Sequence, residues 1–394
     1  MTAKVVVTGL GVICAVGRGT AELQDALRQG RSGIRPLSRF TPKEVPTLPV
    51  AEVAALPGPD DGRPSTHRLA MAAAADAVAD AALSARVPRA RVAVVVGTTT
   101  GGIGNSETWF MRKLAGEIAP PELLFDHPAV TVGHAVAAHV GAEGLCLAVS
   151  TACSSGANAL ITGMDLLRAG VADVVLAGGA DGVCQLPFLG FNSLRLLSDA
   201  PCRPFDRDRA GLNLGEAGAF LVLETEAHAR ARGARVHAEL AGGANTCDAH
   251  HMTAPAPDGA QVVRAMQLAL TQAGARPEDV AYVNAHGTAT PANDAAEAAA
   301  LARLFGEVVP PTSSSKSMLG HTLGAAGALE ALITVLAVRD GFLPPTVGTE
   351  TPLEGAPPDL VLGRARDADV PLAMSNSFAF GGNNAVVVLR RAGS

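Results

Sequence analysis

The fold is decided by the stretch LCLAVSTACSSG, residues 145–156. Its first five residues, Leu145–Val149, are apolar and typical of a short buried strand. Small residues then surround Cys153, and a helical pattern begins at once and continues to about residue 169. A strand that turns directly into a helix is the repeating unit of layered α/β proteins. We therefore predict an α/β fold with Cys153 at a strand-to-helix turn.

The same alternation continues on both sides of this stretch. Before residue 242 we expect strands at Lys4–Thr8, Arg91–Val96, Asp173–Ala177, Phe220–Glu224 and Val236–Leu240, and helices at residues 20–29 and Ala70–Leu83. After residue 242 the pattern starts again, with helices at Val262–Ala273, Ala295–Leu304 and Leu323–Val338 and strands at Val280–Asn284, Leu372–Ser375 and Ala385–Leu389. We therefore predict two similar halves, residues 1–241 and 242–394, each with a mixed, mostly parallel sheet.

Glycine and proline mark the expected interruptions. Gly9 and Gly11 predict a tight turn after the first strand, and Gly178-Gly179 is expected to end another. The proline-rich residues 35–64 and the polar residues 312–321 are expected to lack regular structure.

Composition excludes several classes of protein. The 394 residues are 48% apolar and 17% charged, which allows a large core, and the net charge of −6 gives no signal for nucleic acid. The six cysteines form no CxxC pair with histidine ligands, so no metal site is expected. Residues 1–10 lack a signal-peptide pattern, and the most apolar stretch, Leu323–Val338, is interrupted by Glu330 and short for a membrane span. We expect a cytoplasmic protein with free thiols and no membrane contact.

Cys153 is the first candidate for chemistry. A thiol at a helix N-terminus feels the positive end of the helix dipole, which lowers its pKa and favours the thiolate. The small neighbours leave room for a substrate. A free cysteine is more commonly buried and inert, and position alone gives the two interpretations even weight.

His286 is the second candidate. It follows Asn284 just past the end of a predicted strand, where ligands bind in open α/β sheets, and Thr288 and Thr290 add hydroxyl groups. A lone histidine is more often a core or turn residue, but the flanking glycine and threonines weaken that interpretation.

His321 is the third candidate, in the stretch KSMLGH, residues 316–321. Glu330 follows on an apolar helix, where a carboxylate is costly unless it is paired. Lys316 is its natural partner. The alternative is a surface lysine and an isolated helix glutamate.

The stretch NSFAFGGNN, residues 376–384, is the fourth candidate. Aromatic residues make up only 3% of the chain, so Phe378 and Phe380 beside Gly381 indicate a pocket wall. Ordinary core packing is the alternative.

Together the four stretches resemble the elongating β-ketoacyl-acyl carrier protein synthases, a branch of the thiolase-fold superfamily. The resemblance covers nearly the whole chain and rests on TACSSG, NAHGT and KSMLGH in that order. It implies a thiolase-like fold in α-β-α-β-α layers, with the nucleophile in residues 1–241 and both histidines in residues 242–394. It also implies decarboxylative Claisen condensation of an acyl thioester with a malonyl group on acyl carrier protein, without a cofactor.

The resemblance implies a role for each catalytic residue. Cys153 would accept the acyl chain as a thioester, and His286 and His321 would polarise the malonyl thioester and stabilise the enolate left by loss of CO₂. Lys316 and Glu330 would hold His321 in place.

The remaining site residues would bind substrate. Backbone N–H groups of Cys153 and Phe380 would form an oxyanion hole, and Phe380 would gate access to Cys153. Thr288 and Thr290 would contact the phosphopantetheine arm. The expected substrate-binding residues are Thr288, Thr290, Phe378, Phe380 and Gly381.

Departures from the family pattern leave the pathway open. The gate usually reads Phe-Gly-Phe-Gly-Gly-Thr-Asn, whereas this chain has Ala379 and Asn383. Type II polyketide or polyene assembly is therefore an alternative to fatty acid synthesis, and the dimer is either a homodimer or a heterodimer with a chain-length-factor-like subunit. A non-catalytic chain-length or scaffold subunit is an alternative of a different class.

The resemblance also implies docking of an acidic acyl carrier protein on local basic residues. For each of them, solvated surface charge is an equally good interpretation. The candidates are Arg63, Arg68, Arg112, Lys113, Arg207 and Arg209.

Overall fold

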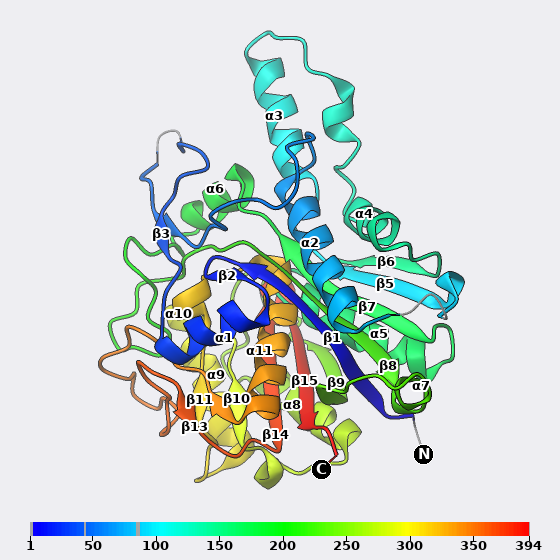
Figure 1. The fold of residues 1–394 in the computed structure, drawn as a ribbon. Coiled ribbons are helices and arrows are strands. Elements are labelled where there is room, and N and C mark those ends of the chain that lie inside the picture. Colours follow the sequence, from blue (N-terminus) through cyan, green and yellow to red (C-terminus); the bar gives the residue numbers. More distant parts are fainter. Residues whose placement is uncertain (1–2, 43–44, 84–86, 394) are drawn as a thin grey trace.

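Most of the strands form one mixed sheet in this computed structural model, which describes residues 3–42, 45–83 and 87–393 (Figure 1). Its path runs β11 (Thr312–Ser313), β10 (Tyr282–Asn284), β14 (Leu372–Ala379), β15 (Asn383–Arg391), β9 (Ala238–Cys247), β1 (Val5–Cys14), β8 (Ala217–Thr225), β7 (Val174–Asp181), β5 (Val92–Gly97) and β6 (Cys146–Val149). Short pairs flank it: β2 (Gly17–Arg18) on β1, β3 (Arg35–Pro36) with β4 (Pro49–Val50), and β12 (Phe342–Leu343) with β13 (Arg366–Asp367).

The path consists of two halves with the same pattern. In one half β6, β5 and β7 are parallel and are followed by antiparallel β8 and β1. In the other β11, β10 and β14 are parallel and are followed by antiparallel β15 and β9. The halves join where Val5–Val7 pair with residues 238–240. The predicted mixed sheets and two similar halves are therefore present, while the division at residue 241 stays a prediction.

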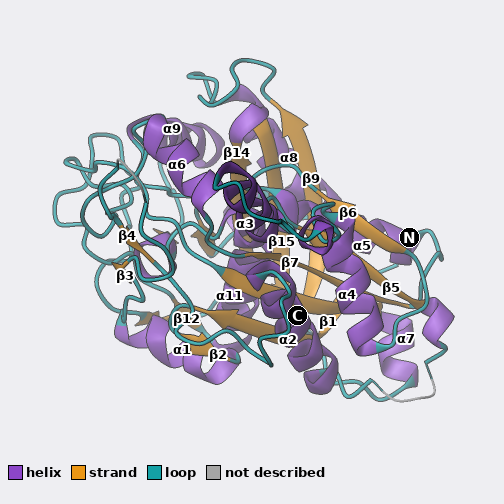
Figure 2. Ribbon diagram, turned by 90° about the horizontal axis from the view of Figure 1, so that it is seen from above, coloured by secondary structure: helices purple, strands orange, loops and turns teal. Residues whose placement is uncertain are grey.

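Helices cover both faces of each half (Figure 2). α2 (Ser65–Asp80) and α4 (Val130–Val140) lie on the outer face of the first half, and α8 (Ala260–Ala273) with α9 (Pro291–Phe305) on that of the second. Between the halves α5 (Ser155–Arg168) packs against α11 (Ala326–Asp340), which is buried from Ala326 to Val338. This is the predicted α-β-α-β-α arrangement.

The other helices are shorter or lie at the edges of these layers. They are α1 (Thr20–Gln29), α3 (Ile103–Leu114), α6 (Gln185–Ser193), α7 (Glu226–Ala231) and α10 (Lys316–Leu319), with 3₁₀ turns η1 (Arg89–Arg91), η2 (Pro121–Leu124), η3 (Pro277–Asp279), η4 (Leu323–Ala325) and η5 (Phe380–Gly382). α3 projects beyond the layers (Figure 1). In the described part of the chain, none of the helices combines the length and apolar character that a bilayer crossing needs.

Two pairs of glycines lie inside strands, where the sequence had predicted a turn or the end of the strand. β1 continues through Gly9 and Gly11, and β7 continues through Gly178-Gly179. A Cβ at Gly9 would lie 2.3 Å from the carbonyl oxygen of Ala77 in α2. A Cβ at Gly11 would lie 1.9 Å from the carbonyl oxygen of Ala73, also in α2. Glycine therefore marks the close approach of α2 to β1.

Several other boundaries differ from the prediction. Residues 312–321 contain β11 and α10, and residues 35–64 contain β3 and β4, although residues 43–44 lie outside the described part. The helix expected at Ala70–Leu83 begins earlier, at Ser65. The one expected at Leu323–Val338 opens with the 3₁₀ turn η4.

Candidate active site

Cys153 lies at the turn between β6 and α5, as predicted. Ala152, next to it, has a φ of 52°, which is uncommon for a residue with a Cβ. Hydroxyl groups hold the turn, since the Thr151 N–H donates to Ser155 Oγ at 2.9 Å and Ser154 Oγ donates to the Thr151 carbonyl at 2.8 Å. The turn therefore fixes the Cys153 thiol, which is only 6% exposed, at the start of α5.

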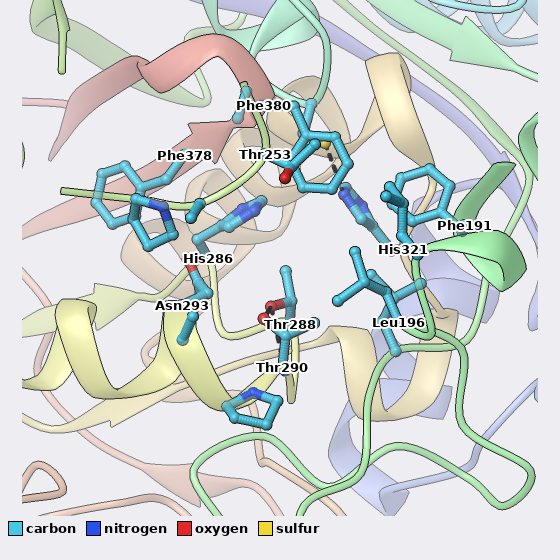
Figure 3. A pocket seen from close by; sticks show the side chains of 18 of the residues that line it. Phe191, Leu196, Thr253, His286, Thr288, Thr290, Asn293, His321, Phe378 and Phe380 are labelled. Carbon is cyan, nitrogen blue, oxygen red and sulfur yellow. Dashed lines mark hydrogen bonds between the residues drawn. The ribbon is translucent and has the colours of Figure 1, made fainter. Parts of the chain in front are cut away.

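Both predicted histidines lie beside this thiol (Figure 3). Nε2 of His321 is 2.9 Å from Sγ of Cys153. The rings of His286 and His321 are 5.4 Å apart, centre to centre, and nearly perpendicular. Residues from β6–α5, from the loop after β10 and from the loop before η4 thus meet at one point.

Burial controls the protonation of these groups. It raises the pKa of the Cys153 thiol to about 12, against the smaller opposing effects of Lys316 and of nearby backbone N–H groups. The predicted thiolate is therefore wrong for this state, because desolvation of an enclosed sulfur outweighs the dipole of α5. Burial, with the charge of Lys316, also lowers the pKa of His286 and of His321 well below the usual value. The resting site holds a neutral thiol and neutral imidazoles.

The pairing predicted between Lys316 and Glu330 is confirmed, with Nζ hydrogen-bonded to Oε1 and both side chains almost fully buried. The expected support of His321 is wrong. Nζ of Lys316 instead donates to the carbonyl oxygen of His286 at 2.6 Å and lies 3.3 Å from its Nδ1. This leaves the proton of a neutral His286 ring on Nε2.

His321 is held through its backbone. Its N–H donates to the carbonyl oxygen of Asn213 at 2.7 Å, and its carbonyl oxygen accepts from the N–H of Gly215 at 2.9 Å. Its Nδ1 is buried and has no hydrogen-bond partner among the described residues. For Nε2 to accept the proton of Cys153, the neutral His321 ring must carry its own proton on Nδ1.

A cavity of about 390 Å³ opens onto the thiol. Of the predicted residues, it is lined by Cys153, His286, His321, Thr288, Thr290, Phe378 and Phe380. Gly381 does not line it; with a φ of 80° it shapes the turn, and its N–H donates to the Met252 carbonyl oxygen. The backbone N–H groups of Cys153 and Phe380, the two donors expected to form an oxyanion hole, are among the groups that oppose the rise in the pKa of the Cys153 thiol.

Two residues at the site were missed. Glu297 on α9 is buried and accepts from the N–H of His286 at 2.9 Å and that of Gly287 at 2.8 Å, so it fixes the histidine loop. A glutamate on an Ala-rich helix carries the same signal that identified Glu330. Phe191 on α6 stacks on Phe380 at 5.4 Å, and only the fold brings these two rings together.

Two of the expected carrier-docking residues are occupied within the fold. Arg68 donates to the carbonyl oxygens of residues 56, 57 and 58, and its side chain is only 13% exposed. Arg209 donates to the carbonyl oxygens of Asp206 and Pro291 and lies beside the buried Asp294. Their guanidinium groups hold loops of the fold and are mostly buried, which favours the other candidates for docking, and the docking set stays a prediction.

Fold and site together define a class of protein. The duplicated α/β fold holds a buried thiol beside a neutral imidazole, with a second histidine and two backbone donors nearby. These are the groups that a thiol-dependent condensing acyltransferase needs. Residues 64–229 match the family model described as β-ketoacyl synthase, N-terminal domain, and residues 237–350 match the C-terminal domain. The chain belongs to the β-ketoacyl synthase family.

Similar proteins span the whole chain. The 3-oxoacyl-[acyl-carrier-protein] synthase 2 of Synechocystis sp. is 36% identical over 98% of each chain. A solved structure described as the ishigamide ketosynthase/chain length factor is 38% identical, with a TM-score of 0.96 over all of both chains. A type II polyketide ketosynthase bound to its acyl-carrier protein is 30% identical, with a TM-score of 0.91 over all of both chains. The predicted fold class and the condensing acyltransferase class are confirmed.

Proposed function

We propose that this protein elongates acyl chains as a β-ketoacyl-acyl carrier protein synthase, with Cys153 as nucleophile. One observation carries the proposal: the Cys153 thiol lies 2.9 Å from a neutral imidazole nitrogen of His321, at the end of a cavity that His286 also lines. A non-catalytic chain-length or scaffold subunit has no need of this arrangement.

The first half-reaction loads the acyl chain. Sγ of Cys153 attacks the carbonyl carbon of an acyl thioester while His321 takes the thiol proton. The N–H groups of Cys153 and Phe380 stabilise the negative oxygen that forms. The carbon–sulfur bond to the carrier then breaks, and the departing phosphopantetheine thiolate takes the proton from His321.

The second half-reaction makes the new carbon–carbon bond. Thr288 and Thr290, whose hydroxyls lie 2.9 Å apart at the cavity wall, contact the phosphopantetheine arm of the malonyl carrier. His286 donates from Nε2 to the thioester carbonyl, so loss of CO₂ leaves a stabilised enolate. The enolate carbon attacks the acyl-Cys153 carbonyl, the Cys153 thiolate leaves, and it takes up a proton from solvent through His321.

Mass spectrometry of the intact protein tests this function. Incubation with an acyl-carrier protein should add one acyl mass, on the peptide that contains Cys153. Addition of malonyl-carrier protein should then remove that mass and yield a β-ketoacyl-carrier protein. No covalent adduct with any acyl-carrier donor would contradict the proposal and favour a scaffold subunit. Acylation without condensation would contradict the proposed elongation.

A second chain of the same fold is the partner we propose, either a second copy or a chain-length-factor-like subunit. α3 has no buried residue, and Phe110, Leu114 and Ile118 on and after it are more than half exposed. β6 lies at the end of the sheet path, an edge open to pairing. Fatty acid and polyketide or polyene assembly remain the two candidate pathways, and the cytoplasm is the proposed location.

Docking of the acidic carrier should rely on the remaining basic candidates, which are Arg63, Arg112, Lys113 and Arg207. Reversing all four charges should weaken the apparent affinity for carrier protein by about tenfold at low salt, and by less at high salt because of screening. Kinetics at two ionic strengths measure this. Reversal of Arg230, a highly exposed arginine on α7, is the control. An affinity unchanged by the fourfold reversal excludes the set.

Ala379 should influence the choice of acyl chain. Its φ of −135° is ordinary extended backbone, so alanine causes no strain here. It does deny the loop the positive φ values that glycine reaches. Ala379→Gly should therefore loosen the loop and shift competition from conjugated towards saturated acyl-carrier substrates by a few fold, with a stability loss below about 1 kcal/mol. An unchanged preference would show that Ala379 is not a selector.

A further inference from the structure

Helix α6 is weakly anchored for an element that reaches the active site. Phe188 is its one buried residue, while Leu186 is 59% and Leu189 36% exposed. Its N-terminal flanking residue, Cys184, supplies no side-chain cap to the first turn. Apolar burial alone therefore gives α6 little to fix its position.

A carboxylate from another helix supplies the missing cap. Glu107 of α3 accepts from the backbone N–H of Leu186 at 2.5 Å and from that of Gln185 at 3.1 Å. It is also hydrogen-bonded to the thiol of Cys184, and α3 packs along α6. A negative group at a helix N-terminus satisfies free N–H donors and opposes the helix dipole favourably, so one side chain holds the start of α6.

The other end of α6 carries a wall of the cavity. Phe191 lies in its last turn and stacks on Phe380, with 25° between the rings (Figure 3). Phe380 in turn lines the same cavity as Cys153, and its backbone N–H is among the groups that lower the pKa of the Cys153 thiol against burial. Leu196, just past the helix, also lines the cavity. Any shift of α6 along its axis therefore moves the ring that covers the gate residue.

We propose that Glu107 is a positioning residue that keeps Phe191 stacked on Phe380 and so controls access to the Cys153 thiol. It touches neither substrate nor the reacting atoms, and acts through α6. Glu107, which fixes the position of α6, therefore lies on α3. This is the projecting helix on which we propose that the partner subunit docks. The inference deepens the proposed function, but access to a thiol can be measured without any condensation.

The test is the rate at which iodoacetamide modifies Cys153, followed peptide by peptide by mass spectrometry. Glu107→Gln keeps the size of the side chain and removes its charge, and should raise the rate about tenfold, which corresponds to about 1.4 kcal/mol in the opening equilibrium. Phe191→Ala should raise it at least as much. If Glu107 acts through Phe191, the double variant should label no faster than Phe191→Ala alone.

The controls separate positioning from general loosening. Glu117→Gln changes an exposed carboxylate just after α3 and should label like wild type. Cys14 and Cys202 are buried elsewhere, so their labelling should stay slow in every variant. Unchanged Cys153 labelling in Glu107→Gln, additive rates in the double variant, or a parallel rise at Cys14 and Cys202 would each overturn the inference. Failure of the proposed function would instead leave these rates as expected and abolish acyl transfer from carrier protein.

Discussion

Replacing Cys153 with alanine should abolish the acyl-enzyme and lower condensation by about 10⁴-fold or more, because removal of a nucleophile usually costs at least that factor. Alanine has no sulfur to attack the thioester, and the oxyanion-hole donors then have nothing to stabilise. Decarboxylation of malonyl-carrier protein should continue, since His286 and His321 remain in place.

The measurement pairs intact-protein mass spectrometry with release of CO₂. Cys247→Ala removes an exposed thiol outside the cavity lining and should acylate like wild type. A Cys153→Ala protein that still gains an acyl mass would show that another residue is the nucleophile. Loss of decarboxylation together with acylation would show that the histidines depend on the thiol.

The sequence alone was sufficient to predict three polar side chains that the structure brings together. Cys153, His286 and His321 each follow a predicted strand or lie in a glycine-rich loop, and the fold brings all three together. Burial arguments also worked for Lys316 and Glu330, because a charge on an apolar helix needs a partner wherever it lies in the sequence.

Spatial relations beyond those motifs could not be predicted. Nothing in the sequence says that Lys316 reaches His286 rather than His321, since the choice depends on how α10 lies against the loop after β10. Nor does the sequence indicate that Cys153 is buried deeply enough to favour the neutral thiol over the thiolate. α3 and α6 were also missed: α3 has an apolar face but buries none of its residues, and α6 buries only Phe188.

Replacing Lys316 with methionine should have the largest effect on stability. The Lys316–Glu330 pair is almost fully buried, and removal of one member leaves a carboxylate inside the apolar α11. Breaking such a pair typically costs about 3–5 kcal/mol. His286 also loses the ammonium group that fixes its tautomer, so malonyl decarboxylation should fall together with the free energy of unfolding.

A double variant separates these two consequences. Lys316→Met/Glu330→Gln removes both charges, so its free energy of unfolding in denaturant should recover most of the loss. Decarboxylation should stay low, because His286 still lacks its partner. Recovery of both stability and decarboxylation would show that Lys316 acts only on stability. Recovery of neither would show that the Lys316–Glu330 pair also supports other parts of the fold.

The pH dependence of the single variant provides a further check on the same pair. Burial already raises the pKa of Glu330 to about 7, against the opposing effect of Lys316, and loss of the ammonium should raise it further. A carboxyl group with a raised pKa in the folded state costs nothing below its unfolded pKa of about 4.5, and destabilises the fold progressively as pH rises from there to the folded value, above which the cost stays constant. With a higher folded pKa, the single variant goes on losing stability above pH 7, where wild type no longer does. The stability difference between wild type and Lys316→Met should therefore be small at pH 5 and large at pH 8. A difference that is constant between these pH values would mean that Glu330 stays charged without Lys316, and that another group or solvent compensates its charge.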